Sequence, residues 1–433
     1  MTWNFHTYYT NRTDGLIGKL LLSDEQREIL KELRKLVRTR IKDVFEEAKT
    51  LAKTSNVNSF SMEDIEAKFL NTKFQHLTPD IKHEIAVLIK NMDDLARTAF
   101  LSLTPRFWTQ GSFQYDTLNR PYNSPPQEMD IDDGTYLPMA VFENKPVIGH
   151  RLLILLVDSS LKSLVAENTG WIFEPKKTCA RIKIPILNTH IDVPMYAIPE
   201  QQFLQKSVAL KALREAKFES YDSYAEEWMN NRSAYEVDSD CVNLALREGE
   251  KKWLNSDPKI IDDWFIESCN RIGRHLRKVC RFLKAWRDAQ WESGGPSSIL
   301  LMVATVNILD RIPHDKDDLG KTMRLLVENL PNEVLKGVKS PDHTDEKLLF
   351  PLPYQHGSHE LNILNKLNEL GNILRGAEIA ESKQGALELI NQAFGKRVTN
   401  SELIVKTISA PAFIPSPSVG EKAKQISKTM SSG

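Results

Sequence analysis

Cysteine is scarce in this chain of 433 residues, which carries only four. They are Cys179, Cys241, Cys269 and Cys280. Their spacings match no zinc-binding pattern, so a structural zinc site is not expected. A few unpatterned cysteines are typical of reduced, mostly buried thiols in a cytoplasmic protein.

Net charge and long apolar runs are also nearly absent. The 57 basic and 58 acidic side chains leave a formal charge of -1, which argues against a long nucleic-acid partner, because such proteins usually carry a basic excess. No run of roughly 18 uncharged apolar residues predicts a membrane span. The start, MTWNFHTYYTNRTDG, lacks the apolar segment of a signal peptide. We therefore expect a cytoplasmic protein that binds neither a membrane nor DNA.

The chain is too long for one ordinary core, and its character changes partway along. Strand and helix patterns mix in the first half, whereas nearly all of the second half has helical periodicity. We predict an α+β domain over 1–245 and a helical domain over 246–408. Residues 409–433 are rich in Pro, Ser and Lys, which predicts a flexible tail.

Periodicity and turn residues predict the individual elements. Ser23 to Gln26 forms a capping box that opens a long helix ending near Lys53, with a basic outer face. Strands are expected over 105–110, around Asp130, and over 178–184 and 189–197. Further helices are expected over 61–71, 78–100, 149–166, 201–218, 257–291, 299–309, 321–330, 362–374 and 383–394.

The strongest chemical signal lies between Gln110 and Asp133. Asp130 and Asp132 are two residues apart on a predicted strand, so both project from one face while the residues between them face a core. Two adjacent carboxylates repel unless a cation or a proton lies between them, and hard oxygen ligands suit Mg²⁺. Upstream, a Gly111–Ser112 turn can present N–H groups and a hydroxyl to substrate phosphates.

Each of these signals is weak by itself, since Asp-x-Asp is common on the wet face of a strand and Gly-Ser is usually only a turn. Asp192 strengthens the combination, because it alternates with apolar neighbours on a later predicted strand. If the two strands are adjacent, three carboxylates converge. Such a cluster near a phosphate-binding turn is typical of two-metal nucleotidyl transfer. No GxxxxGK motif occurs, so a P-loop ATPase is not expected.

The order Gly-Ser, Asp-x-Asp and a later lone Asp resembles the cGAS/DncV-like nucleotidyltransferases of the polymerase-β-like superfamily. The resemblance to the bacterial dinucleotide cyclases of that family covers essentially the whole chain. It is carried by the segments FWTQGSFQYDTLNRP, EMDIDDGTY, LILLVDSSLKSLVAEN, THIDVPMYAIP, NLALREG, KWLNSDPKI and CRFLKAWRDAQW.

The resemblance implies a fold and an activity. The fold is a nucleotidyltransferase core, made of a mixed sheet with flanking helices and a long N-terminal helix, with a C-terminal helical domain across a cleft. The activity is a cyclic dinucleotide synthase that joins ATP and GTP into 3′,3′-cyclic GMP-AMP and releases two pyrophosphates. The product would be a second messenger in bacterial anti-phage defence. Two Mg²⁺ ions per site are implied, with Mn²⁺ as an alternative ion.

By position, the resemblance also implies roles for single residues. Asp130 and Asp132 would hold both metal ions, and Asp192 the catalytic one. The nucleotides would be bound by Gln110, Gly111, Ser112, Phe113, Gln114, Tyr115, Arg181, Ser256, Lys284, Ser298 and Asp345. Lys284 and Ser298 would contact the triphosphate, although periodicity alone makes Lys284 an ordinary solvated lysine and Ser298 an ordinary residue at a helix start.

Several partners are implied as well. A basic group matches a pocket for a folate-like regulator: Arg34, Lys35, Arg38, Arg40 and Arg106. Gly433, at the end of the tail, would be joined to a target by a ubiquitin-ligase-like operon partner, with a protease and a phospholipase effector encoded nearby. The zinc-bearing insertion of the animal DNA sensor in this family is not apparent, so activation by DNA is not expected.

Two alternatives remain open at the level of the sequence. One is a template-free polymerase or transfer-RNA nucleotidyltransferase, which would need a surface for a long anionic acceptor. The other is an inactive nucleotide-sensing scaffold. The balanced charge weakens the first, and the intact carboxylates Asp130, Asp132 and Asp192 argue against the second.

Overall fold

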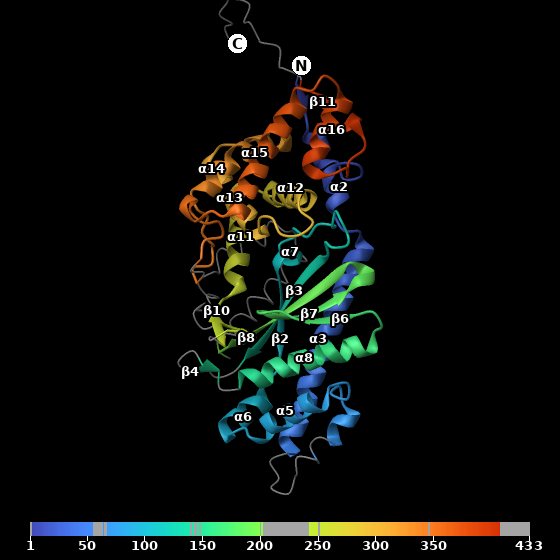
Figure 1. Cartoon of the computed structure of the whole chain (residues 1–433), viewed down its shortest axis with the longest axis vertical. Helices are drawn as coiled ribbons and strands as arrows, with labels where there is room; N and C mark the ends of the chain where they lie inside the picture. Colours follow the sequence, from blue (N-terminus) through green and yellow to red (C-terminus); the bar gives the residue numbers. More distant parts are fainter. Residues whose placement is uncertain are drawn as a thin grey trace, which may run out of the picture.

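The computed structural model describes residues 2–54, 64, 67–138, 141–142, 145–146, 149–199, 201, 242–249, 252–344 and 347–407. Figure 1 shows two lobes stacked along the long axis of the molecule. We call the part that contains the large sheet the core lobe, and the part built from the helices after residue 257 the helical lobe. Among the described residues, none of the helices is both long enough and apolar enough to cross a membrane.

A mixed sheet of seven strands organises the core lobe. Its main path runs β10 (Trp253–Asn255), β9 (Asn243–Ala245), β8 (Thr189–Ile198), β3 (Met129–Pro138) and β2 (Arg106–Gln110). The other two strands are β6 (Ile172–Pro175) and β7 (Cys179–Ile184), and β7 also pairs with β8. The pair β3·β8 is parallel, whereas β2 and β7 run antiparallel to their neighbours. The predicted strands at 105–110, 178–184 and 189–197 are therefore confirmed. A separate small hairpin joins β4 (Val141–Phe142) and β5 (Lys145–Pro146).

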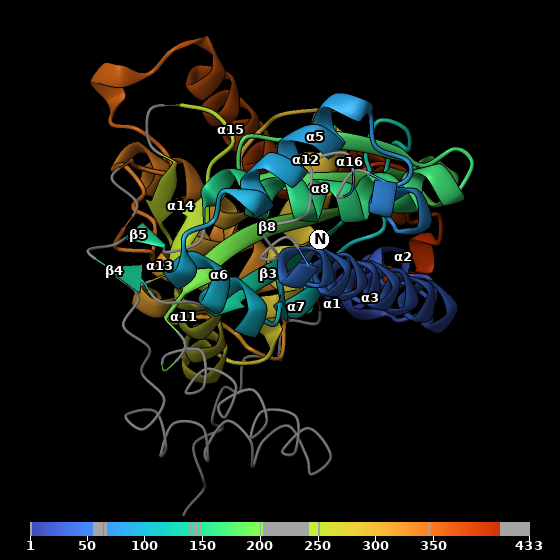
Figure 2. The ribbon, with the colours of Figure 1, turned by 90° about the horizontal axis from the view of Figure 1, so that it is seen from below.

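Helices α3 (Asp24–Thr54) and α8 (His150–Glu167) pack together against this sheet. The predicted capping box is present, since Ser23 Oγ accepts the Gln26 N–H at 3.1 Å and Gln26 Oε1 accepts the Ser23 N–H at 3.0 Å. One apolar cluster joins both helices to the sheet, with Phe45 and Ile131 fully buried in it. Helix α5 (Pro79–Lys90) lies close to α8 (Figure 2).

The prediction of one helix over 78–100 was wrong. The structure ends α5 at Lys90 and begins α6 (Asp94–Ser102) three residues after Asn91. Asp93 caps α6, because its carboxylate accepts the Ala96 N–H at 2.7 Å. Residues 61–63 and 65–66 of the predicted helix 61–71 lie outside the described residues, and the segment ends in a 3₁₀ turn at Phe69–Asn71. The predicted helix 201–218 lies almost entirely outside the described residues.

The helical lobe contains the remaining long helices, which largely match their predicted positions. They are α11 (Pro258–Ile272), α12 (His275–Gln290), α13 (Ser298–Arg311), α14 (Leu319–Leu335), α15 (Ser358–Glu378) and α16 (Lys383–Phe394). The prediction of one helix over 257–291 was wrong, because Gly273 adopts a φ of 129° that ends α11. Short 3₁₀ turns lie at Pro185–Leu187, Pro353–Gln355 and Ser401–Leu403.

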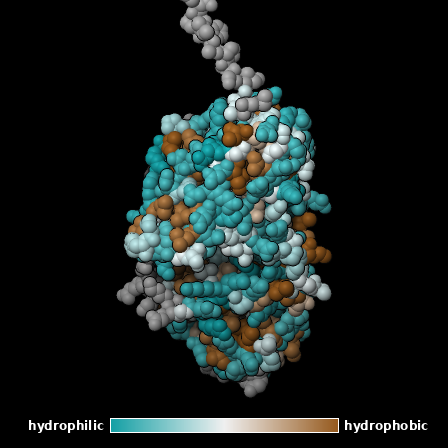
Figure 3. All heavy atoms as spheres, turned by 45° about the horizontal axis from the view of Figure 1, so that its top comes forward, coloured by the Kyte–Doolittle hydropathy of each residue, from teal (hydrophilic) through white to brown (hydrophobic). Residues whose placement is uncertain are grey.

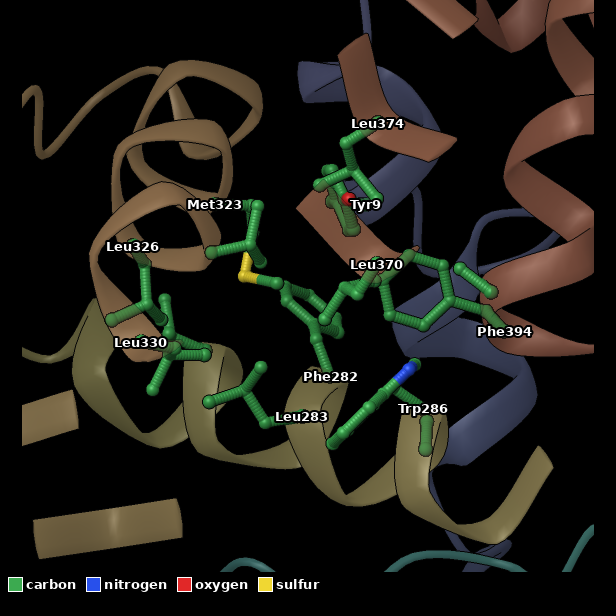
Figure 4. Close-up of a cluster of buried hydrophobic side chains, with 14 of the residues drawn as sticks. Tyr9, Phe282, Leu283, Trp286, Met323, Leu326, Leu330, Leu370, Leu374 and Phe394 are labelled. Atoms are coloured by element: carbon green, nitrogen blue, oxygen red, sulfur yellow. The ribbon is translucent and has the colours of Figure 1, made fainter. Parts of the chain in front are cut away.

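The start of the chain packs inside the helical lobe, on the opposite side of the molecule from α5 (Figure 1). Strand β1 (Trp3–Asn4) pairs with β11 (Val405–Lys406), and short helices α1 (His6–Thr10) and α2 (Leu16–Leu20) follow it. Figure 4 shows Tyr9 beside Phe282 and Phe394, and the Tyr9 and Phe282 ring centroids are 4.9 Å apart. Residues from both ends of the chain therefore share one core.

On the outside, hydrophilic and hydrophobic side chains are interspersed over the face shown in Figure 3. This mixture is ordinary for a folded globular protein. Most of the buried apolar side chains belong to two large clusters, one in each lobe, and two smaller clusters lie beside them.

Candidate active site

Three carboxylates meet where β3 and β8 run side by side. Asp132 pairs in register with Asp192 of β8, so both side chains leave neighbouring strands at the same level. Asp130 projects from the same face as Asp132, while Ile131 between them is fully buried. Oxygens of Asp130 and Asp192 lie within 4.8 Å of each other and of a ring nitrogen of His190. The predicted convergence of the three carboxylates is confirmed.

The cluster has the electrostatics of a cation site. Burial, together with the negative charges of Asp130 and Asp192, raises the pKa of Asp132 to about 8. Such a carboxyl holds a proton at neutral pH unless a cation compensates the crowded charge. A divalent ion would do so, and oxygen-rich ligand sets suit hard cations. The residues therefore fit a divalent metal, since one ligand atom each from Asp130, His190 and Asp192 lies within 4.8 Å of the others.

His190 and Glu128 belong to this cluster, and the sequence interpretation missed both. His190 Nε2 lies 3.0 Å from Asp130 Oδ1, and its Nδ1 lies 2.9 Å from Glu128 Oε2. Burial alone would lower the pKa of His190, but the contact with Asp130 outweighs it and the pKa lies above its usual value. The available signal was alternation, because His190 stands two residues before Asp192 and Glu128 two before Asp130.

Arg181 of β7 binds Asp192 directly. Its Nε and Nη2 atoms donate to the two carboxylate oxygens at 2.6 and 2.7 Å, which is a bidentate ion pair. Arg181 and Asp192 are partners in the antiparallel register of β7 and β8, so the strand pairing itself sets this contact. Arg181 thus lies at the edge of the carboxylate cluster.

The Gly111–Ser112 turn lies against the same carboxylates. Gly111 has a φ of 65°, and a Cβ on it would come within 2.0 Å of Asp132 Oδ2. Only glycine tolerates both this conformation and this approach. The turn opens the single-turn helix α7 (Gly111–Gln114), which follows β2 directly. Ser112 and Asp132 therefore line one cavity.

That cavity, of about 630 Å³, is bounded by residues of both lobes. Its volume falls in the usual range of small-molecule sites. From the core lobe it is lined by Gly111, Ser112, Tyr115, Asp130, Asp132 and His190. From the helical lobe it is lined by Lys284, Arg287, Ser297, Ser298 and Met302, among others. An acidic wall on strands thus faces the cations Lys284 and Arg287 on helices, which we call the basic wall, although Asp288 and Glu292 lie beside them.

Lys284 and Ser298 lie in the basic wall, 14 positions apart in sequence. Lys284 is buried, and burial together with the nearby charge of Arg287 lowers its pKa to about 8. Its Nζ donates to the Thr117 carbonyl at 2.8 Å, so the prediction from periodicity of a solvated lysine was wrong. Ser298 Oγ accepts from Arg287 Nη1 at 2.8 Å, whereas the α13 cap is Ser297.

Other predicted nucleotide-binding residues lie near the cavity without lining it in the described part of the chain. Gln110 is buried between two tyrosines, donating to Tyr136 Oη at 3.1 Å. Phe113 packs on the apolar cluster of the core lobe, and Gln114 ends α7. The Ser256 N–H donates to Val242 O, just before α11. Asp345 and Gly433 lie outside the described residues.

The predicted regulatory arginines separate into two groups. Arg38 forms a bidentate pair with buried Asp133 of β3, and Arg34 donates to Thr109 Oγ1 at 2.6 Å. Arg40 is buried elsewhere, against Ser163 Oγ at 2.7 Å and Glu167. Lys35 is exposed on α3, and Arg106 begins β2.

Comparisons with known proteins agree with this geometry. The nucleotidyltransferase domain described as Cyclic GMP-AMP synthase DncV-like matches residues 105–196, and the Cyclic GMP-AMP synthase C-terminal domain matches 273–407. The Cyclic GMP-AMP synthase of Vibrio cholerae serotype O1 is 61% identical over 437 residues, covering 100% of both chains, and one from Escherichia coli is 55% identical over 434 residues with the same coverage.

Solved structures agree as well. Vibrio cholerae DncV in complex with the linear intermediate 5′ pppA(3′,5′)pG is 60% identical with a TM-score of 0.86, covering 94% of this chain and 100% of that one. The same protein in complex with GTP and 5MTHFGLU2 has the same identity and TM-score, covering 94% and 99%. The chain therefore belongs to the family of DncV-like cyclic GMP-AMP synthases, which are nucleotidyltransferases.

Proposed function

We propose that this enzyme joins ATP and GTP into 3′,3′-cyclic GMP-AMP in two successive nucleotidyl transfers, releasing two pyrophosphates. The observation that carries the proposal is the carboxylate cluster of Asp130, Asp132 and Asp192 beside the Gly111–Ser112 turn, with Ser112, Asp130 and Asp132 lining one cavity. The relative from Vibrio cholerae, solved with a linear pppA-pG intermediate, supports both substrates and a stepwise order.

We further propose that Asp130, Asp132 and Asp192 hold two Mg²⁺ ions. Bound there, the ions would supply charge neutralisation for the triphosphate and activation of the attacking hydroxyl. Binding requires Asp132 to lose the proton that its raised pKa favours, so metal uptake below pH 8 releases a proton. Titration of the metal-free protein with Mg²⁺ in two buffers of different ionisation heat measures this release without any turnover.

The chain's own residues bind and orient the nucleotides. Ser112 contributes its hydroxyl to the phosphates beside the carboxylates, and Lys284 and Ser298 approach the same cavity from the helical lobe. Tyr115 also lines the cavity and is assigned to the base or ribose of the donor nucleotide. The remaining assignments rest on the family resemblance: Gln110, Gly111, Phe113, Gln114, Arg181, Ser256 and Asp345.

The test is the product spectrum. The pure enzyme is incubated with Mg²⁺ and all four ribonucleotides, and the products are identified by mass spectrometry and nuclease digestion. We expect cyclic GMP-AMP with two 3′–5′ linkages. Linear oligomers would support a polymerase instead, and unchanged nucleotides would support a nucleotide-sensing scaffold.

We also propose a regulator and a division into domains. The relative solved with 5MTHFGLU2 supports a folate-like ligand, for which Arg34 and Arg38 are the available cations beside β2 and β3. Residues 1–245 would form the catalytic domain, 246–408 the helical domain and 409–433 the tail, with residues 3–20 packed into the helical domain. Protection of Arg34 and Arg38 from modification by added methyltetrahydrofolate would test the regulator.

The biological setting is proposed from the family resemblance. The cyclic product would activate a phospholipase effector in anti-phage defence, and an operon partner would join Gly433 to a target. Coexpression with the neighbouring genes, followed by mass spectrometry of the C-terminal peptide, tests the second part. An unmodified Gly433 under these conditions would refute conjugation.

A further inference from the structure

Two basic residues of α12, Arg281 and Lys284, are buried rather than solvated. The basic side chains of this helix recur at spacings of three and four, which would normally form an exposed cationic stripe. Arg281 is only 2% exposed and Lys284 only 5%. Burying two cations on neighbouring turns is costly unless acceptors surround them. The acceptors therefore reveal what these side chains do.

Those acceptors are the main-chain carbonyls of one short segment, residues 115–118, which follows α7. Arg277 Nε donates to Tyr115 O at 3.2 Å, Arg281 Nε to Asp116 O at 3.1 Å, and Lys284 Nζ to Thr117 O at 2.8 Å. Arg281 Nη1 donates to Leu118 O as well. Four consecutive carbonyls thus bind three cations of one helix, a set of contacts that we call the carbonyl clamp.

Arg281 makes the central contacts of the clamp. Its Nη2 donates to Asp116 Oδ1 at 2.9 Å, and its Nη1 to Asn119 Oδ1 at 3.2 Å. In return, Asn119 Nδ2 donates to the Arg281 carbonyl at 2.8 Å. Asp116 has a φ of 55°, an unfavourable conformation for a residue with a side chain. The clamp holds the segment in that conformation.

The clamped segment continues directly from the turn that faces the carboxylates. The Tyr115 N–H donates to Gly111 O at 3.0 Å, and the Thr117 N–H to Ser112 O at 2.9 Å. On the other side, β2 is held by β3, with Gln110 in register with Asp132. The turn is therefore fixed from both ends, by the sheet before it and by the clamp after it.

We propose that Arg281 is a positioning residue for nucleotidyl transfer, which sets the place of Ser112 relative to Asp132 by holding residues 116–119. The inference rests on the proposed function. Among the described residues that line the cavity, Lys284 is present and Arg281 is not, so Arg281 acts through the segment and not on the substrate. It also makes the catalytic turn dependent on the helical lobe, since the lobe supplies the donor atoms.

The geometry makes the expected defect specific. Arg281→Lys keeps a cation but has a single donor group, which cannot reach Asp116, Leu118 and Asn119 together. The protein should fold, while Ser112 loses its fixed position. A displacement of about 1 Å at a substrate-binding group can lower turnover about 100-fold, so we expect kcat to fall between about 10-fold and 100-fold at saturating nucleotide.

The experiment compares Arg281→Lys and Arg281→Met with the matched control Arg271→Met. Arg271 lies on α11, with its side chain 52% exposed and paired with Asp310, so its loss should leave kcat unchanged. The readouts are kcat, KM for each nucleotide, the melting temperature, and hydrogen exchange of a peptide spanning 111–120. We expect faster exchange in that peptide and reduced kcat in both Arg281 variants, and neither in the control.

Three outcomes are decisive. Faster exchange over 111–120 with lowered kcat in folded Arg281→Lys supports positioning. A lowered melting temperature with normal kcat at temperatures where the variant is folded would show a purely structural role and overturn the inference. If Arg281→Met fails to fold, Arg281→Lys decides alone. A wild-type enzyme that yields no cyclic product overturns the proposed function instead, and exchange over 111–120 still reports on the clamp.

Discussion

The carboxylates on one side of the cavity and the cations on the other are stabilised in different ways. On the acidic wall, Asp130, Asp132 and Asp192 crowd together, and burial leaves Asp132 with a strongly raised pKa. On the basic wall, Lys284 is already bound to a carbonyl of the protein itself, as is Arg281, which lies on the same helix but does not line the cavity. The acidic wall can thus bind a cation from solution, whereas the cations of α12 are used largely in hydrogen bonds that stabilise the folded protein. Charge lining an active site is not by itself evidence of substrate contact.

The largest effect is expected on the acidic wall. Asp132→Asn should reduce cyclic dinucleotide formation at least about 1000-fold, equivalent to about 4 kcal/mol of lost transition-state stabilisation. Above pH 8, where wild-type Asp132 is ionised, it should also raise the melting temperature of the metal-free protein, because one of three crowded charges is removed. Product quantification and calorimetry measure the two effects. Glu174→Gln on β6, an acid paired with Lys176, serves as the control, and equal losses in both variants would contradict the assignment.

A smaller effect is expected on the basic wall. Lys284→Met should lower kcat/KM for ATP and GTP about 10-fold to 100-fold, since a charge-assisted hydrogen bond contributes about 1.5–3 kcal/mol. Steady-state kinetics with each nucleotide varied in turn would measure it. A loss as great as that of Asp132→Asn would remove the distinction between the walls, because Lys284 would then be as essential as a metal ligand.

The start of α12 offers a test of stability. Gly273 has a φ of 129°, and an added Cβ would lie 2.9 Å from His275 Nδ1. Gly273→Ala should therefore destabilise the protein by about 1–3 kcal/mol. Gly371→Ala is the matched control, because its nearest neighbour would be Val327 O at 3.7 Å and helical alanine is favoured. Denaturant unfolding of both variants gives the difference, and equal stabilities would show that α12 tolerates a different start.

The last effect concerns acid stability. His275 Nε2 lies 2.9 Å from His314 Nε2, and burial, followed by the charge of His314, lowers the pKa of His275 to about 4. In the unfolded chain His275 binds a proton near pH 6.5, whereas in the folded protein it does so only near pH 4. The free energy of unfolding therefore falls as the pH drops from 6.5 to 4. The slope from this group is at most about 1.4 kcal/mol per pH unit. His275→Gln should flatten the profile and exposed His359→Gln should not.

Much of the acidic wall was predictable from sequence because strand alternation is a local rule. It gave the common face of Asp130 and Asp132, and the side of β8 on which Asp192 lies. The same rule places His190 beside Asp192, yet a histidine among apolar neighbours gave no reason to assign it to the site. Its partners, Asp130 and Glu128, are about 60 residues away, and only the parallel pairing of β3 and β8 brings them together.

The burial of Arg281 and Lys284 was less predictable, because their hydrogen-bond partners lie far away in the sequence. The carbonyls that bind Arg281 belong to residues about 165 positions earlier. Every residue has a main-chain carbonyl, so the sequence does not indicate which carbonyls bind a side chain. Periodicity therefore predicted a solvated stripe. Both helix breaks were missed for a related reason: Gly273 ends α11 through its backbone conformation and Asp93 caps α6 through its carboxylate, and a continuous apolar pattern conceals both.

The pairing of β1 with β11 has a consequence for synthesis on the ribosome. Trp3 and Tyr9 emerge first, but their packing partners in the helical lobe begin near Val279, and the strand that closes over them is Val405–Lys406. The strands that carry the three aspartates are complete by Ile198. Trp3 and Tyr9 therefore lack their native packing partners until most of the chain has been translated. The carboxylate face can form early, but the cavity also needs the lining residues of the helical lobe, the last of which is Leu349.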